Sequence, residues 1–203
     1  MSAEPDEQTH REVLEDLRGL HLRASRLHTP LASGNPKKVV APSWRCRGTF
    51  SFLHDCAPDA RVVIGDARLE LAKDSYGFDL LAIDAFSSDS IPLHLMTEEA
   101  FATYGRALSR DGLLLVHISN RFIDLAPMVS ALAEAGGWHG RLRHDQGELA
   151  NGLSPSIWIA LARSKDRLRQ LERDSDLSWK ELPPPARRAW TDDNASILPL
   201  LRW

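Results

Sequence analysis

Acidic and imidazole side chains stand where apolar runs of this sequence end, and they are the first candidates for chemistry. Asp66 follows the run 61–65, Asp84 ends the run 78–84, and His117 lies near the end of another apolar run. A carboxylate can accept hydrogen bonds from an amine or take a proton from it, and an imidazole can do either. The pattern therefore indicates cation binding or acid–base chemistry.

Asp66 has two compatible interpretations. A carboxylate directly after Gly65 can accept hydrogen bonds from the exocyclic amine of a bound base, because a glycine lets a flat ligand approach the backbone closely. Aspartate is equally a favoured N-cap, and a helical turn is expected to begin at Ala67. The residues alone leave both roles open.

Asp84 and Asp89 lie in one loop, Asp-Ala-Phe-Ser-Ser-Asp-Ser-Ile-Pro, after the most apolar run of the chain. Two carboxylates there can hold a cation or accept a proton from an amine. Asp89 and its neighbouring serines are also common turn formers. That alternative has less weight for Asp84, since so apolar a strand seldom ends in an acid without a partner.

The remaining polar candidates have structural alternatives. His94 and His117 are more often hydrogen-bonded core or rim histidines than catalysts, and Ser119 and Asn120 either close a pocket or cap the next segment. Acids of the segment Trp190-Thr-Asp-Asp lie at the mouth of a pocket or, more simply, in a surface turn. The histidines show no metal-ligand spacing, so we predict no metal, and neither a phosphate-binding loop nor a G-x-G-x-x-G motif is present.

Alternating strands and helices are expected to position these side chains. Strands are predicted at 61–65, 78–84, 112–119, 138–144 and 156–163, and helices at 66–73, 97–109, 123–135 and 165–173. Thr97 is the expected N-cap of its helix, Asp111-Gly112 a turn, and Gly136-Gly137 a helix end. This order predicts a three-layer α/β domain with a C-terminal antiparallel hairpin, whose chemistry lies at the carboxyl ends of the parallel strands.

Residues 1–47 differ in character from residues 48–203, which we take as the main domain. An amphipathic helix is expected over 11–27, followed by a loop segment in which Val39-Val40 is a weak strand candidate.

With 203 residues, 43% hydrophobic residues and a net charge of -3, the chain has the composition of one globular domain. Its charge balance gives no general electrostatic reason to expect binding of nucleic acid or an anionic membrane. The polar N-terminus, the short apolar runs and the lone thiols Cys46 and Cys56 predict a cytoplasmic protein without a membrane segment.

Four blocks of the sequence resemble the spermidine synthase-like family. They are Gly65-Asp-Ala-Arg-Leu, the stretch from Phe78 to Phe101 with Asp-Ala-Phe-Ser-Ser-Asp-Ser-Ile-Pro, the run from Gly112 to Asn120, and the closing Trp190-Thr-Asp-Asp with Leu-Leu-Arg-Trp. The resemblance covers roughly residues 48–203. It implies a Rossmann-like fold of the class I methyltransferase type that uses S-adenosylmethionine or its decarboxylated form, without a metal.

The resemblance also implies site roles. Gly65, Asp66, Ala67 and Asp84 would line the nucleoside site, with Asp66 contacting adenine and Asp84 accepting a proton. Asp89 and His94 would bind the acceptor amine, such as putrescine. A small-molecule amine partner and a homodimer are further implications, and polyamine biosynthesis is the implied process.

The sequence departs from the family in ways that keep rival functions open. Ala85-Phe86 lengthens the acidic loop, Ser90 replaces a proline, and Phe78 replaces a common tyrosine. The family's first strand, its glycine-rich loop and its second strand with a ribose-binding acid have no counterpart, so the expected sheet is incomplete at the N-terminus. A methyltransferase of the same fold and a truncated, non-catalytic relative are therefore the alternatives to an aminopropyltransferase-like enzyme.

Overall fold

The computed structural model describes residues 38–41, 61–73, 77–84, 93–147, 155–175 and 177–201. The predicted helix at 11–27, both cysteines and the predicted amine ligand Asp89 lie outside these residues.

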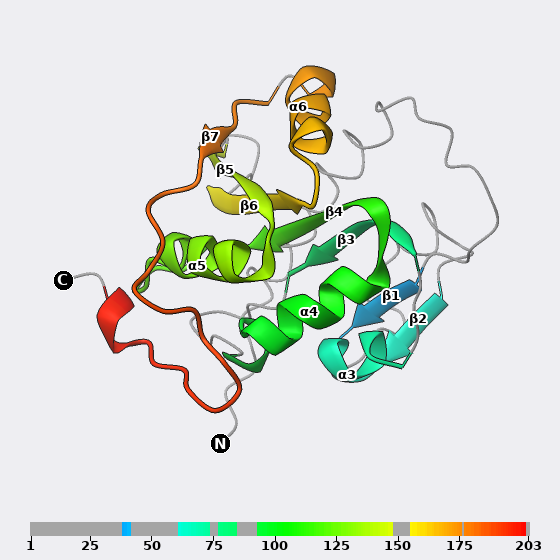
Figure 1. Cartoon of the computed structure of the whole chain (residues 1–203), viewed down its shortest axis with the longest axis horizontal. Helices are drawn as coiled ribbons and strands as arrows, with labels where there is room; N and C mark the ends of the chain where they lie inside the picture. Colours follow the sequence, from blue (N-terminus) through cyan, green and yellow to red (C-terminus); the bar gives the residue numbers. More distant parts are fainter. Residues whose placement is uncertain are drawn as a thin grey trace.

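A five-stranded mixed sheet, ordered β3-β4-β6-β5-β7, forms the centre of the described structure (Figure 1). β3 and β4 are parallel, whereas β6 is antiparallel to both of its neighbours, β4 and β5. The strand bounds are β3 (Phe78–Ile83), β4 (Leu108–His117), β5 (His139–Asp145), β6 (Ser156–Ala162) and β7 (Lys180–Glu181). The predicted C-terminal antiparallel hairpin is therefore confirmed as β5–β6.

Helices cover both faces of this sheet and make it a three-layer α/β structure. Successive side chains of a strand point to opposite faces. Leu114 and Val116 of β4 accordingly join the core under α4 (Glu98–Ala107) and α5 (Ala126–Gly136), while Leu113 and Leu115 join a second core under α6 (Lys165–Asp174). Strands buried on both faces read as continuous apolar runs, which is why the sequence Leu-Leu-Leu-Val predicted this strand.

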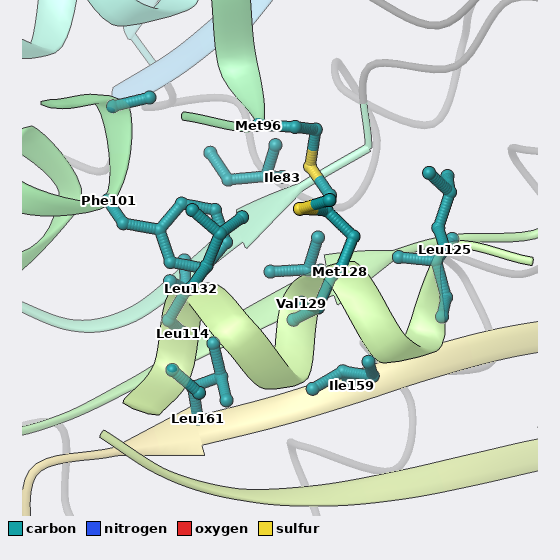
Figure 2. Packing of buried hydrophobic residues seen from close by; sticks show 14 of the residues in the cluster. Ile83, Met96, Phe101, Leu114, Leu125, Met128, Val129, Leu132, Ile159 and Leu161 are labelled. Atoms are coloured by element: carbon teal, nitrogen blue, oxygen red, sulfur yellow. The ribbon is translucent and has the colours of Figure 1, made fainter. Parts of the chain in front are cut away.

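The larger core lies between α5 and the sheet (Figure 2). Met128, Val129 and Leu132 of α5 pack over Ile159 and Leu161 of β6, and each of these side chains is at most 3% exposed. Gly137, with φ of 67°, follows the helix in the left-handed conformation that a glycine adopts without strain, as the sequence predicted for this helix end. Thr97 likewise caps α4 as predicted, because its side chain accepts a hydrogen bond from the backbone of Ala100.

The predicted turn at Asp111-Gly112 is wrong, because both residues lie within β4. The pairing of the two strands is irregular there. Phe78 of β3 is paired with Leu108 of β4, but the next pair is Leu80 with Leu113, so β4 has extra residues between the two pairs. A Cβ on Gly112 would lie 2.7 Å from the carbonyl oxygen of Phe78. Glycine is thus needed for close approach of two strands, which is a second common reason for a glycine within a strand pattern.

A second, two-stranded parallel sheet pairs β1 (Lys38–Ala41) with β2 (Arg61–Ile64). The strand candidate at Val39-Val40 is therefore confirmed, and it joins a strand of the segment that begins at residue 48. After β2 comes the short helix α3 (Ala67–Leu71). The 3-10 helix η1 (Leu93–Leu95) precedes α4.

The C-terminal segment, residues 182–201, runs back along the helical layer over α5 and the start of α4 (Figure 1). Three backbone hydrogen bonds of 2.8 to 3.0 Å hold this segment to the helical layer. The N–H of Ala186 donates to the carbonyl of Pro127, that of Glu98 to Trp190, and that of Asp124 to Leu200. The segment ends with η3 (Leu198–Leu200). Within the described residues, none of the helices has the length and apolar character that crossing a membrane requires.

We expect Leu114→Ala to lower the free energy of unfolding by about 2–5 kcal/mol, because it leaves a cavity at a fully buried position of β4. Leu198→Ala is the matched control, since that side chain is 71% exposed and its loss should change stability by less than about 0.5 kcal/mol. Urea denaturation followed by circular dichroism measures both. Equal effects of the two substitutions would contradict the core described above.

Candidate functional site

The register of the two parallel strands places Asp84 beside His117. Ile83 of β3 is paired with Val116 of β4. Asp84 directly follows Ile83, and His117 directly follows Val116. Oδ1 of Asp84 lies 2.8 Å from Nδ1 of His117. Both side chains are buried, with exposed fractions of 8% for Asp84 and 10% for His117. The apolar strand does end in a partnered acid, as its sequence indicated.

The second carboxylate oxygen of Asp84, Oδ2, is buried and has no hydrogen-bond partner among the described residues. A buried ionised oxygen is unfavourable unless a positive or hydrogen-bonding group compensates it. This oxygen is therefore suited to a cationic or N–H-bearing ligand. Of the groups at this site, it gives the clearest indication of the kind of ligand that the site would bind.

Asp66 caps α3 with one oxygen and binds His94 with the other. Its Oδ1 accepts the N–H of Leu69 at 2.9 Å, and its Oδ2 lies 2.8 Å from Nε2 of His94. Burial by itself would raise the pKa of Asp66, but the hydrogen bonds from Leu69 and His94 together hold it below its usual value. The capping role is confirmed. An adenine amine would have to share an oxygen that already accepts a hydrogen bond.

Gly65 and Ala67 flank this acid at the carboxyl end of β2. A Cβ on Gly65 would lie 3.1 Å from Oε1 of Glu70, so the Glu70 side chain occupies the space beside this glycine. Ala67 is the first residue of α3. A flat ligand that stacks against Gly65 would therefore require the Glu70 side chain to move.

Asp192 of the C-terminal segment connects α3 to the start of α4. Arg68 donates to both of its carboxylate oxygens, at 2.7 and 2.6 Å, and Thr97 donates to Oδ1 at 2.8 Å. The backbone N–H of Asp192 donates to Glu99 at 3.1 Å. Hydrogen bonds from Arg68 and Thr97 lower the pKa of Asp192 to about 2. The hydrogen bond to Asp192 in turn raises the pKa of Arg68.

An open cavity of about 820 Å³ lies over this network. Its lining includes Arg68, His94, Thr97, Asp192 and Asp193. The two interpretations of the Trp190-Thr-Asp-Asp segment are thus both correct, because it forms a turn and that turn lines a cavity. A second cavity, of about 890 Å³, lies between α5 and the C-terminal segment and contains none of the predicted site residues.

The structure brings Asp66 and His94 together but does not connect them to Asp84 by any described hydrogen bond or ion pair. Asp84 does not line either of the two cavities described above. Asn120 accepts hydrogen bonds from the backbone N–H groups of Phe122 and Ile123, so its capping interpretation is confirmed.

The contacts of Asp192 with Arg68 and Thr97, which lie 124 and 95 positions away from it, were not predicted from the sequence. The only available signal was Arg68 within the block Gly-Asp-Ala-Arg-Leu, and a surface arginine has no specific spacing that predicts a distant acid. In the part of the chain that the structure describes, no three His, Cys, Asp or Glu side chains gather as metal ligands.

Neither a family model nor a curated protein matches this chain. Among solved structures, it is similar to a probable spermidine synthase from Corynebacterium glutamicum, with 16% identity and a TM-score of 0.46 over 69% of this chain and 58% of that one. It is also similar to spermidine synthase from Thermotoga maritima, with 17% identity and a TM-score of 0.47 over 95% and 71% of the two chains. A TehB-like S-adenosylmethionine-dependent methyltransferase from Corynebacterium glutamicum matches with 18% identity and a TM-score of 0.31, over 77% of this chain and 99% of that one.

These likenesses concern the fold and not an activity. The chain spans 58% of the length of the first of these structures. The α/β class itself is established by the sheet order, the two cores and the helices on both faces described above.

We expect the ion pair of Asp192 and Arg68 to be complete above pH 3.8, the ordinary pKa of the acid, and to be lost as the pH falls through about 2. A carboxyl group whose pKa is lowered in the folded state contributes its stabilisation above the unfolded pKa and loses it on acidification. A carbon-13 NMR titration of the Asp192 carboxyl group measures this. Arg68→Met should move its midpoint upward, toward 3.8.

Arg169→Met is the matched control for this titration, because Arg169 forms an exposed ion pair with Asp166 on α6. It should leave the Asp192 midpoint in place. An unchanged midpoint in Arg68→Met would show that Arg68 is not the cause of the low pKa.

Proposed function

We propose that this chain is a transferase that moves an alkyl group from the sulfonium of a nucleoside to an amine. The donor is decarboxylated S-adenosylmethionine or S-adenosylmethionine, and the acceptor is a small amine such as putrescine. The observation that carries the proposal is the buried carboxylate of Asp84, which has one oxygen held by His117 and one oxygen without a described partner.

The acceptor must lose a proton before it can react. An alkylammonium group titrates near the pKa of lysine, about 10.4, and has no lone pair while protonated. A buried carboxylate binds this cation and can then take one of its protons. The unpartnered Oδ2 of Asp84 suits both tasks, whereas both oxygens of Asp66 already accept hydrogen bonds.

The sulfonium nucleoside, when bound, supplies an electrophilic carbon and a neutral thioether as the leaving group. The amine nitrogen forms a bond to that carbon, the carbon–sulfur bond breaks with its electron pair going to sulfur, and the proton released by the amine goes to Asp84. Charge balances, because the new ammonium retains one positive charge and the carboxylate becomes neutral. The resemblance of the sequence around Asp84 to the spermidine synthase-like family supports this choice of reaction.

In this proposal, the residues around α3 bind the nucleoside. Asp66 would accept a hydrogen bond from the base by sharing an oxygen with Leu69 or His94, and His94 and Arg68 line the open cavity beside it. These polar groups and the cavity volume of about 820 Å³ fit a nucleoside-sized ligand.

We expect Asp84→Asn to lower turnover by at least about 10²-fold while nucleoside binding is retained, since the amide cannot take a proton but can still accept the hydrogen bond from His117. Asp79→Asn is the matched control on the same strand, because Asp79 is exposed and bonds to Ser109 at the opposite end. Calorimetric titration with S-adenosylmethionine, its decarboxylated form and methylthioadenosine measures binding. Formation of alkylated putrescine measures turnover.

The results of these assays distinguish the proposed reaction from a methyltransferase and from a non-catalytic protein. Methyl transfer from S-adenosylmethionine without aminopropyl transfer would favour the methyltransferase alternative. No binding heat with any of the three nucleosides would overturn the proposal and favour a non-catalytic protein. Full activity of Asp84→Asn would remove Asp84 from the role of proton acceptor.

A further inference from the structure

Three hydrogen bonds in series connect the carboxylate of Asp84 to the backbone of β6. The N–H of Ile157 donates to Oγ of Ser119 at 2.8 Å, and this Oγ lies 2.6 Å from Nε2 of His117. The other ring nitrogen, Nδ1, lies 2.8 Å from Oδ1 of Asp84. The series therefore begins on a largely buried central strand and ends on the acid to which we assign the proton.

The chemistry of the two ends restricts the directions of these bonds. A backbone N–H can only donate, so the oxygen of Ser119 accepts, and its own hydrogen is available for Nε2 of His117. An ionised carboxylate can only accept, so Nδ1 carries a hydrogen and donates it to Asp84. The neutral Nδ1–H tautomer of His117 satisfies both conditions.

Packing fixes the plane of the imidazole. The ring of His117 stacks on Trp158 with centroids 4.7 Å apart and an interplanar angle of 25°. Trp158 is buried in β6 and is paired with His117 in the antiparallel register of β4 and β6. The orientation of this ring is thus restricted by strand pairing, by stacking on Trp158 and by hydrogen bonds at both of its nitrogens.

We propose that His117 is a positioning residue that orients the carboxylate of Asp84, so that Oδ2 is the oxygen that receives the proton of the acceptor. This inference rests on the proposed function. A bond from His117 to Oδ1 restricts rotation of the carboxylate, and misplacement of a reacting group by about 1 Å costs on the order of 10²-fold in rate. Neither ring nitrogen needs to exchange a proton with substrate.

The order Asp–His–Ser is also that of a hydrolase triad, in which the serine is the nucleophile. Here Oγ of Ser119 accepts a backbone hydrogen bond from β6, so the serine serves as the anchor of the imidazole. The two roles are chemically distinguishable. A nucleophilic serine reacts with a fluorophosphonate probe, and an anchoring serine does not.

The test compares His117→Asn with His117→Leu. The amide nitrogen of asparagine occupies the place of Nδ1 and can donate to Asp84, whereas leucine fills similar space and cannot. We expect His117→Leu to lower kcat by about 10²-fold with an unchanged KM for the amine and an unchanged nucleoside Kd. His117→Asn should recover most of the lost kcat, and His144→Leu, an exposed histidine of β5, should have no effect.

Equal loss of kcat in the two His117 variants would overturn the inference, as would a loss confined to KM or to thermal stability. Labelling of Ser119 by the fluorophosphonate would also overturn it. Proton–nitrogen NMR of the ring gives a readout that needs no turnover: we expect a downfield hydrogen on Nδ1 of His117 that disappears in Asp84→Ala.

Failure of the proposed function is distinguishable from failure of this inference. A wild-type protein that binds no nucleoside and alkylates no amine would contradict the proposed function, and the NMR measurement would then decide whether His117 orients Asp84. An unprotonated Nδ1, or a signal that persists in Asp84→Ala, would overturn the inference whether or not turnover is found.

Discussion

The hydrogen bond between the buried Asp84 and His117 is the constraint on which the candidate site depends. Removing an ionised carboxylate from water is unfavourable unless hydrogen bonds or opposite charges compensate it. One oxygen of Asp84 is compensated by His117, and the other has no partner among the described residues. The uncompensated oxygen is the chemical reason to expect a cationic or N–H-bearing ligand at this edge of the sheet.

Two clusters of side chains lie at the carboxyl ends of different parallel strands. In the first, around Asp66 and Arg68, both oxygens of each acid already accept hydrogen bonds within the protein, and residues of the cluster line an open cavity. The second, around Asp84, is buried and keeps an acceptor unpaired. This difference is the reason that the proposed function assigns ligand positioning to the first cluster and proton transfer to the second.

The strands and helices of the main domain were largely predictable, because their signals are local. Apolar runs predicted β3 and β6, Thr97 predicted the start of α4, and the Gly-Gly pair predicted the end of α5. Gly112 was misassigned because a glycine that permits close approach of two strands has the same sequence signature as a turn. β7 has two residues and is defined only by its pairing with β5, so no local pattern could reveal it.

The sequence alone determined that acids and a histidine stand at the ends of apolar strands, since residue type and strand periodicity are properties of a short stretch of chain. Which of these groups meet was decided by the tertiary structure. Strand register joined Asp84 to His117, and chain reversal brought Asp192 to Arg68 across 124 positions. Contacts of this kind depend on the relative placement of distant elements, and that placement follows from packing of the whole core and not from any local pattern.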